Sequence, residues 1–374
     1  MNQQERLKAL INNKETDYAD DIYLNPVKEY IDSKIDLKEK EVFFKNSPIC
    51  IGAAALIPDK GDWFTVQLIN TPILVVRKNK NNISAYLNIC SHRGARIAEG
   101  TGKKAYSFKC PYHSWVYSLD GKLIGRPREK AFEKLPKSIC GLKKLKIHNL
   151  NGFLWLTLNS KSEKGYKKNV KILSNLTKNY NVNNYHFYKT TKMYRKLNWK
   201  LAVDTFLELY HIDHLHNATL GPTIMSDLGL FDSFGPHIRI TGARTSALQP
   251  NSIKNKKEFD IHTLKVHILF PNTILVTHSE HIEIWHVLPG DKENECEVTL
   301  SLFSKEKIKS ASAKRHWENN FTLAIDVVRE EDFPLGEGVQ KGFYADPKRK
   351  LIFGKNEPGL QHFHKQIKLA LTKK

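Results

Sequence analysis

Four residues with metal-binding side chains form two mixed pairs in the first third of the chain. Cys90 and His92 are separated by one residue, Cys110 and His113 by two, and seventeen residues (93–109) lie between the pairs. Two thiolates and two imidazoles can hold a [2Fe–2S] cluster in which one iron takes both Cys and the other takes both His. Zinc uses the same residue types, but its sites usually pair Cys with Cys and His with His. The mixed pairs therefore favour the cluster.

A second set of candidate ligands lies at the end of a predicted helix over 199–210, whose apolar residues recur at helical spacing. Glu208 and His211 are three residues apart, which would place them on one side of a helical turn. The partner of His211 could be His214, which lies at helical spacing from it, or His216. Side chains five residues apart point to different sides of a helix, so His216 could join His211 only if the helix ends or bends between them. The residues alone leave this choice open.

Antiparallel strands are the elements that must position the Cys/His pairs. The apolar, β-rich runs 71–78 and 83–90 are joined by the turn-forming sequence KNKNN. The dipeptides Asp120-Gly121 and Asn151-Gly152 each separate two further runs, which predicts hairpins. Each Cys/His pair would then lie in a loop that follows a strand, and two such loops can close on one cluster.

Several β runs between 237 and 304 follow the predicted helix and indicate an antiparallel sheet that packs against it. The N-terminal segment, 1–44, is predicted to be helical in part because Leu7, Leu10 and Ile11 fall on one helix face. Four histidines in the later runs are interpreted as core or pocket-wall residues and not as a second metal site: His267, His278, His281 and His286.

Composition narrows the function further. The 374-residue chain has 59 Lys and Arg against 39 Asp and Glu, a net charge of +20, but the lysines are spread along the chain and no nucleic-acid-binding motif accompanies them. We therefore expect a solvated surface or an acidic electron-transfer partner, and no nucleic acid. No apolar run is long enough for a membrane helix and no signal peptide precedes the chain, so the expected location is cytoplasmic. Three scattered cysteines are expected to be free thiols: Cys50, Cys140 and Cys296.

The two sets of candidate ligands carry a family resemblance. The stretches HRGA after Cys90 and CPYHSW from Cys110 resemble the cluster-binding motif of Rieske iron–sulfur proteins. The stretch from Asn198, with NWK, an acidic residue, Tyr-His, four residues and His, is similar to the mononuclear-iron motif of Rieske non-heme iron oxygenases, the alpha components of the ring-hydroxylating oxygenase family. The resemblance covers about residues 40 to 365. It departs at Thr205, where relatives often carry Asn.

The resemblance implies an α+β fold with three parts: residues 1–44 packing on the catalytic domain, an antiparallel β Rieske domain over 45–160, and a helix-grip (START-like) catalytic domain with an antiparallel sheet over 161–374. It implies His211 and His216 as ligands of a mononuclear Fe(II). The third ligand is expected from the acidic segment 327–343, as Asp332, with Glu331 and Asp326 as fallbacks. The implied ligands of the [2Fe–2S] cluster are Cys90, His92, Cys110 and His113.

The resemblance further implies a terminal oxygenase that hydroxylates, dihydroxylates or demethylates a small organic substrate, which we expect to be aromatic. Alternatives are a monooxygenase acting on a quaternary ammonium compound and, more remotely, a non-catalytic electron-transfer protein. The family forms ring-shaped trimers in which Glu208 would be the bridging carboxylate of a His113–Glu208–His211 link between subunits. Since the chain shows no recognisable nicotinamide or flavin motif, a separate NAD(P)H-dependent reductase is expected, with or without a ferredoxin or a small β-subunit.

Overall fold

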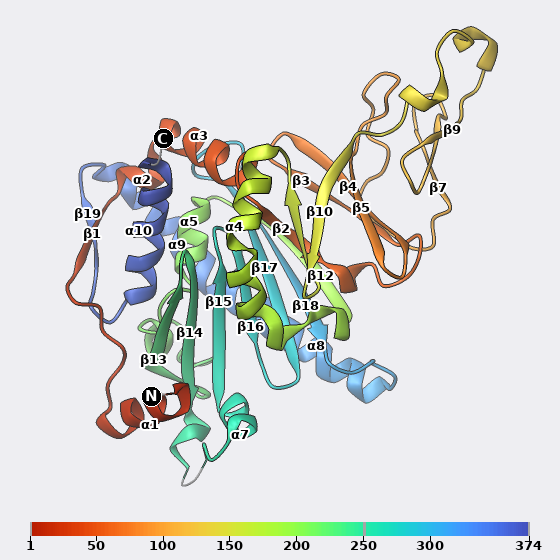
Figure 1. The fold of residues 1–374 in the computed structure, drawn as a ribbon. Helices are drawn as coiled ribbons and strands as arrows, with labels where there is room; N and C mark the ends of the chain where they lie inside the picture. Colours follow the sequence, from red (N-terminus) through yellow and green to blue (C-terminus); the bar gives the residue numbers. More distant parts are fainter. Residues whose placement is uncertain (1, 250–251, 373–374) are drawn as a thin grey trace. The chain divides into compact units, whose positions relative to one another are not determined.

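The computed structural model describes residues 2–249 and 252–372. The chain folds into two compact units, one made of residues 43–184 and the other of residues 1–42 together with 185–374. Each unit combines helices with antiparallel strands (Figure 1). Among the described residues, no helix is both long and apolar enough to cross a membrane. The predicted α+β class is therefore confirmed.

The unit of residues 43–184 is built on a seven-stranded antiparallel sheet with the order β2-β11-β10-β5-β4-β3-β6, beside a three-stranded sheet β7-β8-β9. A helix, α4 (Ser160–Thr177), follows the last strand. The strands of the larger sheet are β2 (Ile49–Ala53), β3 (Trp63–Leu68), β4 (Thr71–Asn79), β5 (Asn82–Leu87), β6 (Thr101–Gly102), β10 (Lys144–Leu150) and β11 (Phe153–Thr157). Those of the smaller sheet are β7 (Ser107–Lys109), β8 (Val116–Ser118) and β9 (Leu123–Gly125).

The predicted hairpins of this unit are present. Strands β4 and β5 pair across the KNKNN turn, β8 pairs with β9, and β10 pairs with β11. Asn151 and Gly152 have φ angles of 52° and 88°. Two consecutive positive φ values are what a two-residue turn matched to the strand twist requires, and Asn-Gly tolerates them better than other residue pairs. The turn chemistry thus fits the register of the β10–β11 hairpin.

The other unit is built on a seven-stranded antiparallel sheet with the order β12-β18-β17-β16-β15-β14-β13. Its strands are β12 (His186–Arg195), β13 (Ile224–Phe234), β14 (His237–Arg244), β15 (Thr263–Leu269), β16 (Thr273–Thr277), β17 (His281–Pro289) and β18 (Cys296–Ser304). A separate pair joins β1 (Tyr23–Pro26) to β19 (Lys350–Phe353), and in Figure 1 it lies beside the C-terminal helix α10 (Pro358–Thr372).

The helices of this unit come from both ends of the chain. Helix α1 (Gln3–Asn13) begins with a capping box between Asn2 and Glu5 and buries Leu7 against Leu228 and Leu230. Helix α8 (Ala311–Asp326) continues through a π-helical turn, η8 (Val327–Asp332), into α9 (Phe333–Ala345). The shorter helices are α2 (Lys28–Ile31), α3 (Ser33–Glu39), α5 (Trp199–Asp204), α6 (Ile212–Leu215) and α7 (Lys256–Ile261).

The helix predicted over 199–210 is wrong in its length, since α5 ends at Asp204 and the next helix, α6, begins only at Ile212. After Asp204 the chain leaves the helix through tight-turn bonds from Phe206 N to Val203 O and from Leu207 N to Asp204 O. Farther on, the Oε2 atom of Glu208 accepts hydrogen bonds from the backbone N–H groups of Tyr210 and His211. A side chain that satisfies these N–H groups competes with continuation of the helix. The histidines therefore sit around a new, short helix and not along one long one.

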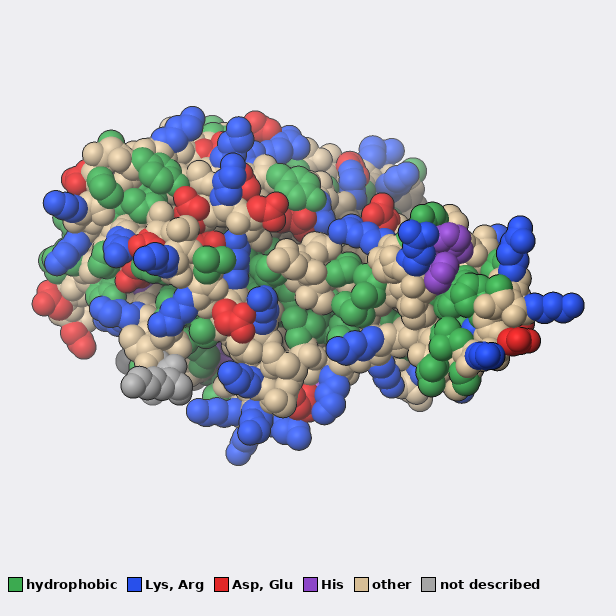
Figure 2. All heavy atoms as spheres, turned by 90° about the horizontal axis from the view of Figure 1, so that it is seen from above, with side chains coloured by type: hydrophobic (Ala, Val, Ile, Leu, Met, Phe, Trp, Pro, Cys, Tyr) green, Lys and Arg blue, Asp and Glu red, His purple; other side chains and the backbone are tan. Residues whose placement is uncertain are grey.

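On the face drawn in Figure 2, basic side chains do not gather into a single patch. Figure 2 shows Lys and Arg scattered over the visible face, with Asp, Glu and apolar side chains between them. Many Lys and Arg residues also pair with acids, as in the contacts Lys78–Asp120 and Lys189–Glu318. The excess of positive charge is therefore distributed on this face and does not form the stripe expected of a nucleic-acid-binding surface.

Candidate metal centres

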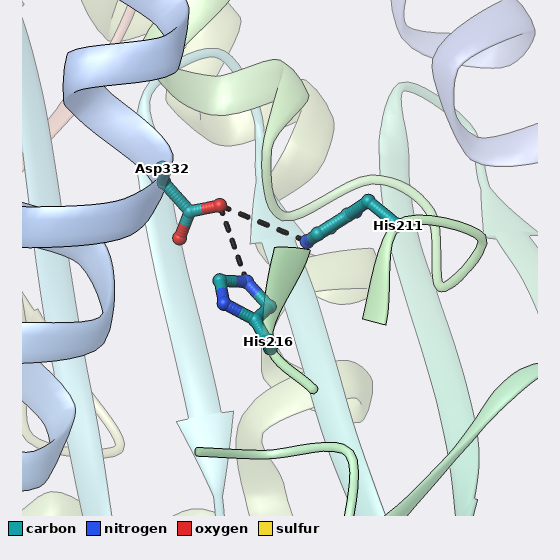
Figure 3. Close-up of side chains that lie close together, drawn as sticks. All are labelled: His211, His216 and Asp332. Atoms are coloured by element: carbon teal, nitrogen blue, oxygen red, sulfur yellow. Dashed lines mark ion pairs between the residues drawn. The ribbon is translucent and has the colours of Figure 1, made fainter. Parts of the chain in front are cut away.

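Three side chains that can bind a metal converge in the unit of residues 1–42 and 185–374. One ligand atom each from His211, His216 and Asp332 lies within 4.8 Å of the others. The Oδ1 atom of Asp332 is 3.7 Å from Nε2 of His211 and 3.3 Å from Nε2 of His216 (Figure 3). The two imidazole rings are 4.9 Å apart and inclined by 71°, so their Nε2 atoms face the carboxylate from two directions. Two His and one carboxylate make the donor set that suits non-heme Fe(II) and leaves positions open.

The short helix α6 explains how two histidines five residues apart reach one point. His211 precedes its first residue and His216 follows its last, and backbone hydrogen bonds join Leu215 to His211 and His216 to Ile212. His214, the alternative that helical spacing allowed, lies within α6 and is exposed to solvent. It is not part of the converging group.

Each converging histidine uses its other ring nitrogen to contact an acid. His211 Nδ1 contacts Glu208 Oε1, and His216 Nδ1 is 2.5 Å from Glu331 Oε2, which also accepts a hydrogen bond from Thr219. A carboxylate at Nδ1 keeps the proton there and leaves the Nε2 lone pair free for a metal. Glu331, expected only as a fallback ligand, thus lies on the far side of His216 from Asp332. The other fallback, Asp326, pairs with Arg329.

The acids also set the charge state of His216. Burial lowers the pKa of this imidazole, but hydrogen bonds and charges from Asp332 and Glu331 outweigh burial and raise the pKa above its ordinary value. The pocket therefore stabilises positive charge at this imidazole. A bound divalent cation would take the place of that proton, because metal ligation requires neutral imidazole.

Helix α5, which leads into the His211 segment, is anchored by a buried ion pair. Lys200 Nζ is 2.6 Å from Glu39 Oε2, and the same oxygen accepts the indole N–H of Trp199 at 2.8 Å. Farther along, Leu209 packs so closely on the sheet that a Cβ at Gly229 would lie 2.7 Å from its side chain. The first contact fixes the start of the segment on α3, and the second shows that Leu209 fills the space above Gly229 in β13.

The Cys/His pairs occupy two loops with the same backbone scheme. In the first, Cys90 N donates to Ala95 O and Gly94 N donates to Cys90 O. In the second, Cys110 N donates to Trp115 O and Ser114 N donates to Cys110 O. The residue four positions after each Cys is left-handed, with φ of 78° at Gly94 and 59° at Ser114. The loops are thus two copies of one turn, each presenting a thiol and an imidazole.

The side chains in these loops fit a [2Fe–2S] cluster. Cys90 and Cys110 are buried and their thiols interact, while the rings of His92 and His113 lie 4.6 Å apart. The buried Nδ1 atom of His92 has no hydrogen-bond partner among the described residues. Ligation of a metal would account for this unpaired nitrogen. The donor set of two thiolates and two imidazoles is that of a Rieske centre.

Tyr117 is a neighbour of this site that the sequence did not single out. Its hydroxyl is 3.1 Å from Cys90 Sγ and also accepts the backbone N–H of Ser91. Burial, with the contact to Cys90, raises the pKa of Tyr117 to about 12, so the phenol stays protonated and can donate to the sulfur. Its position in β8, after the second Cys/His pair, was the only available signal.

Two protein families match the chain. The family described as "Ring hydroxylating alpha subunit (catalytic domain)" matches residues 182–373, and the family described as "Rieske [2Fe-2S] domain" matches residues 47–143. The chain is 29% identical over 198 residues to the glycine betaine monooxygenase oxygenase subunit of Chromohalobacter salexigens. That match covers 53% of this chain and 44% of the relative, so the matched region spans less than half of that protein's length.

Solved structures share the fold. The quaternary ammonium Rieske monooxygenase CntA superposes with a TM-score of 0.79 at 20% identity, covering 95% of each chain, and inter-subunit electron transfer has been described for it. Naphthalene 1,2-dioxygenase from Rhodococcus sp. superposes with a TM-score of 0.76 at 16% identity, covering 99% of this chain and 98% of the other. The fold is therefore the same for enzymes named after a quaternary ammonium compound and after an aromatic hydrocarbon.

Proposed function

We propose that this chain, which belongs to the ring-hydroxylating alpha-subunit family, is an oxygenase component that uses O2 to oxygenate a small organic substrate. The observation that carries the proposal is the convergence of His211, His216 and Asp332, with an acid behind each histidine. The bound metals would supply single electrons from the cluster and reductive activation of O2 at the iron. We keep the division into a cluster domain, 45–160, and an iron domain, 161–374, as part of this proposal.

The chain's own residues would orient the ligands and hold protons. Glu208 and Glu331 keep a proton on Nδ1 of His211 and His216, which directs both Nε2 lone pairs to the point that Asp332 faces. In the other domain the residues that would hold the cluster are Cys90, His92, Cys110 and His113.

We propose a quaternary ammonium compound as the substrate class. Support comes from the relatives, since the matched Chromohalobacter protein is named for glycine betaine and CntA for quaternary ammonium compounds. An aromatic substrate, our expectation from the sequence, is the second candidate because naphthalene 1,2-dioxygenase has the same fold over 99% of the chain. Pocket residues, and not the fold, must decide between them.

Electrons would arrive from outside the chain. We propose a separate NAD(P)H-dependent reductase, with or without a ferredoxin, and a homotrimer in which His113 of one subunit lies near Glu208 of the next. The contact of Glu208 with His211 Nδ1 supports its role as the bridging carboxylate, because it already forms one half of that link. The described inter-subunit transfer in CntA supports the same route.

A single-turnover experiment tests the activity. The iron-loaded protein is reduced chemically and mixed with O2 and each of a panel of quaternary ammonium compounds and aromatics, while the cluster absorbance and the products are followed. Substrate-dependent reoxidation with an oxygenated product is expected for a quaternary ammonium compound. Product from an aromatic alone would favour the second candidate, and the lack of a Rieske spectrum would overturn the cluster assignment.

The variant Glu208→Gln tests the bridging role. We expect it to retain the cluster and, at saturating Fe(II), the mononuclear iron, but to slow cluster reoxidation by about tenfold to a hundredfold, the range for loss of an outer carboxylate. Asp213→Asn, an exposed acid in the neighbouring helix α6, is the matched control and should react like the wild type. Wild-type reoxidation in Glu208→Gln would refute the bridging role.

A further inference from the structure

A second group of polar side chains lies in the same unit as the proposed iron site. We call it the β17 cluster, and it consists of Arg244 at the end of β14, His278 in the β16–β17 turn, and His281 and Glu283 on β17. Arg244 Nη2 is 3.1 Å from His278 Nδ1, and His278 Nε2 is 3.2 Å from Glu283 Oε1. His281 Nε2 is 3.5 Å from the same oxygen, while the indole N–H of Trp285 donates to Glu283 Oε2 at 3.0 Å.

The hydrogen bonds determine where the protons lie. A guanidinium can only donate, so His278 Nδ1 must accept and the proton of the neutral ring must be on Nε2, which then donates to Glu283. Burial lowers the pKa of His278, so the ring is neutral. Burial alone would raise the pKa of Glu283, but the donors His278 and His281 lower it below its ordinary range. The cluster therefore links the guanidinium of Arg244 to the carboxylate of Glu283 through the neutral ring of His278.

The two charges are not equally available to a ligand. Glu283 is buried and both of its oxygens are engaged by the donors His278, His281 and Trp285. Arg244 is only partly buried and carries five N–H donors, of which one reaches His278; it forms no ion pair with a carboxylate among the described residues. The charge that the cluster offers to a further partner is therefore the guanidinium.

The β17 cluster lies on the sheet face that the iron-ligand segments cover. Trp285 contacts Phe206, five residues before His211, with ring centroids 5.4 Å apart. His281 contacts Trp317 at 5.3 Å, in the helix α8 that leads through η8 to Asp332. Both elements that supply the iron ligands thus rest against this cluster.

A third connection joins Arg244 itself to the His216 loop. Arg244 pairs with Ile224 in the β13–β14 ladder, and the next residue, Thr245, donates its backbone N–H to Thr223 O at 3.1 Å. The same loop turns back to His216, whose carbonyl accepts the N–H of Gly221 at 2.9 Å. The backbone of Arg244 therefore lies beside the loop that follows the second histidine.

We propose that Arg244 binds an anionic group of the substrate, held in orientation by Glu283 acting through His278, so that the substrate of the proposed oxygenase is zwitterionic or anionic and not a simple cation. This inference rests on the proposed function and narrows its substrate class to compounds with a carboxylate. A planar guanidinium suits this task, because it can give two parallel N–H bonds to a carboxylate. Among quaternary ammonium compounds it favours glycine betaine over choline.

A metal ion is a poorer occupant of the β17 cluster, although two histidines and a glutamate lie close together there. The rings of His278 and His281 are stacked 4.1 Å apart at an interplanar angle of 9°. Both Nε2 atoms face the same oxygen of Glu283, at 3.2 Å and 3.5 Å, so the carboxylate already occupies the point at which they meet. Moreover, the Nε2 atom of His278 already carries its proton, and Arg244 places a positive charge next to the ring.

Four probes test the proposal by separating the two charges of a zwitterion. Glycine betaine carries both charges, choline keeps the cation but replaces the carboxylate by a hydroxyl, 3,3-dimethylbutyrate keeps only the anion, and 3,3-dimethylbutanol has neither. Binding is measured by anaerobic calorimetry on the iron-loaded, oxidised protein, so no turnover is required. We expect the wild type to prefer the carboxylate over the hydroxyl within each pair by at least about tenfold, since truncating one partner of a buried charge pair usually costs more than that.

The variants are Arg244→Gln and Arg244→Lys, with Arg315→Gln on the exposed side of α8 as the matched control. Arg244→Gln should weaken glycine betaine and 3,3-dimethylbutyrate by at least about tenfold and leave the two hydroxyl compounds within about twofold. Arg244→Lys should weaken the carboxylates less, because it keeps the charge but loses the fork. Equal weakening of all four probes, or no carboxylate preference in the wild type, would overturn the proposal.

Two further measurements distinguish failure of this inference from failure of the proposed function. The Rieske spectrum and the iron content of each variant report whether the metal sites are intact, and single-turnover product formation reports the oxygenase activity. Oxygenation of choline with no carboxylate preference would overturn the Arg244 assignment and leave the oxygenase intact. Carboxylate-selective binding without any oxygenation would overturn the proposed function and leave the anion site intact.

Discussion

One unit of this protein contains two groups of two histidines and one carboxylate, and they are built for different tasks. In the group of His211, His216 and Asp332, the rings are inclined by 71° and their Nε2 atoms meet at the carboxylate. In the group of His278, His281 and Glu283, the rings are parallel within 9°. The residue types are the same apart from the length of the acid, so composition alone does not define a metal site.

The two groups differ in what contacts the outer ring nitrogen, which is the nitrogen that does not face the shared carboxylate. In the first group the outer nitrogens, Nδ1 of His211 and His216, contact the acids Glu208 and Glu331, which keep protons there and free the inner lone pairs. In the second, the outer nitrogen of His278 accepts from Arg244, which forces the proton to the inner side. An acid behind a histidine therefore prepares a metal ligand, whereas a guanidinium behind it prepares a hydrogen-bond donor.

Replacing one histidine of each group by alanine should give the largest difference between the two groups, because only one of them is proposed to bind iron. His216→Ala should reduce the non-cluster iron bound per chain by more than about tenfold, since loss of a ligand costs more than the tenfold to hundredfold effect of an outer-shell change. His281→Ala, the matched variant, should keep its iron and lower only substrate binding. Metal analysis of both proteins, with the Rieske spectrum as an internal standard, measures this; equal iron loss in both would contradict the comparison.

Removing the acid behind His216 should have a smaller effect. Glu331→Gln keeps the size of the side chain but cannot hold the Nδ1 proton as a carboxylate does, so iron affinity should fall by about tenfold to a hundredfold. Glu330→Gln changes the neighbouring exposed acid, which pairs with Arg329, and should bind iron like the wild type. Competition against a chelator gives both affinities. If Glu331→Gln and Glu330→Gln compete alike, the outer acid does not prepare the ligand.

Much of the fold and of both metal centres could be predicted from the sequence, because the features that define them depend on residues close together in the chain. The Cys/His pairs, the hairpin turns at Asp120-Gly121 and Asn151-Gly152, and the segment containing Asp332 all depend on neighbours within a few residues. The choice between His214 and His216 came from the family resemblance, since the predicted long helix gave no reason for it. The helix ends at Asp204, and the N–H groups of Tyr210 and His211 bond to the side chain of Glu208, a contact that helical periodicity does not report.

The β17 cluster escaped prediction for a different reason. Arg244 and Glu283 are 39 residues apart, and they are brought together through His278 only by the order of strands β14 to β17. In the sequence, the histidines of these strands are indistinguishable from core residues. Contacts across several strands depend on sheet order and register, which the sequence pattern of single strands does not contain.

The smallest effect is expected from Glu283→Gln, which leaves the shape of the β17 cluster but turns its acceptor partly into a donor. The amide cannot accept from His278, His281 and Trp285 together, so one N–H group loses its partner and the free energy of unfolding should fall by about 1–3 kcal/mol. Orientation of Arg244 through His278 should also loosen, so glycine betaine should bind more weakly, but less so than in Arg244→Gln. Iron content should stay at the wild-type level, which sets this variant apart from Glu331→Gln.

The pH dependence of the stability lost in Glu283→Gln tests whether the ionised carboxylate is responsible for it. Because the pKa of Glu283 is below its ordinary value of 4.5 in the folded protein, its contribution is fully present above that pH and is lost as the pH falls through the folded pKa. The groups that face this carboxylate are His278 and His281, with Arg244 behind His278, and the lowered pKa of His278 also makes the wild type less stable below pH 6.5. The stability gap between wild type and Glu283→Gln, measured by denaturant unfolding, should therefore stay constant from pH 8 to pH 6.5 and narrow only below about pH 4.5. A gap that does not narrow below about pH 4.5 would show that Glu283 is not held as a carboxylate in the folded protein, and the donor scheme of the β17 cluster would be wrong.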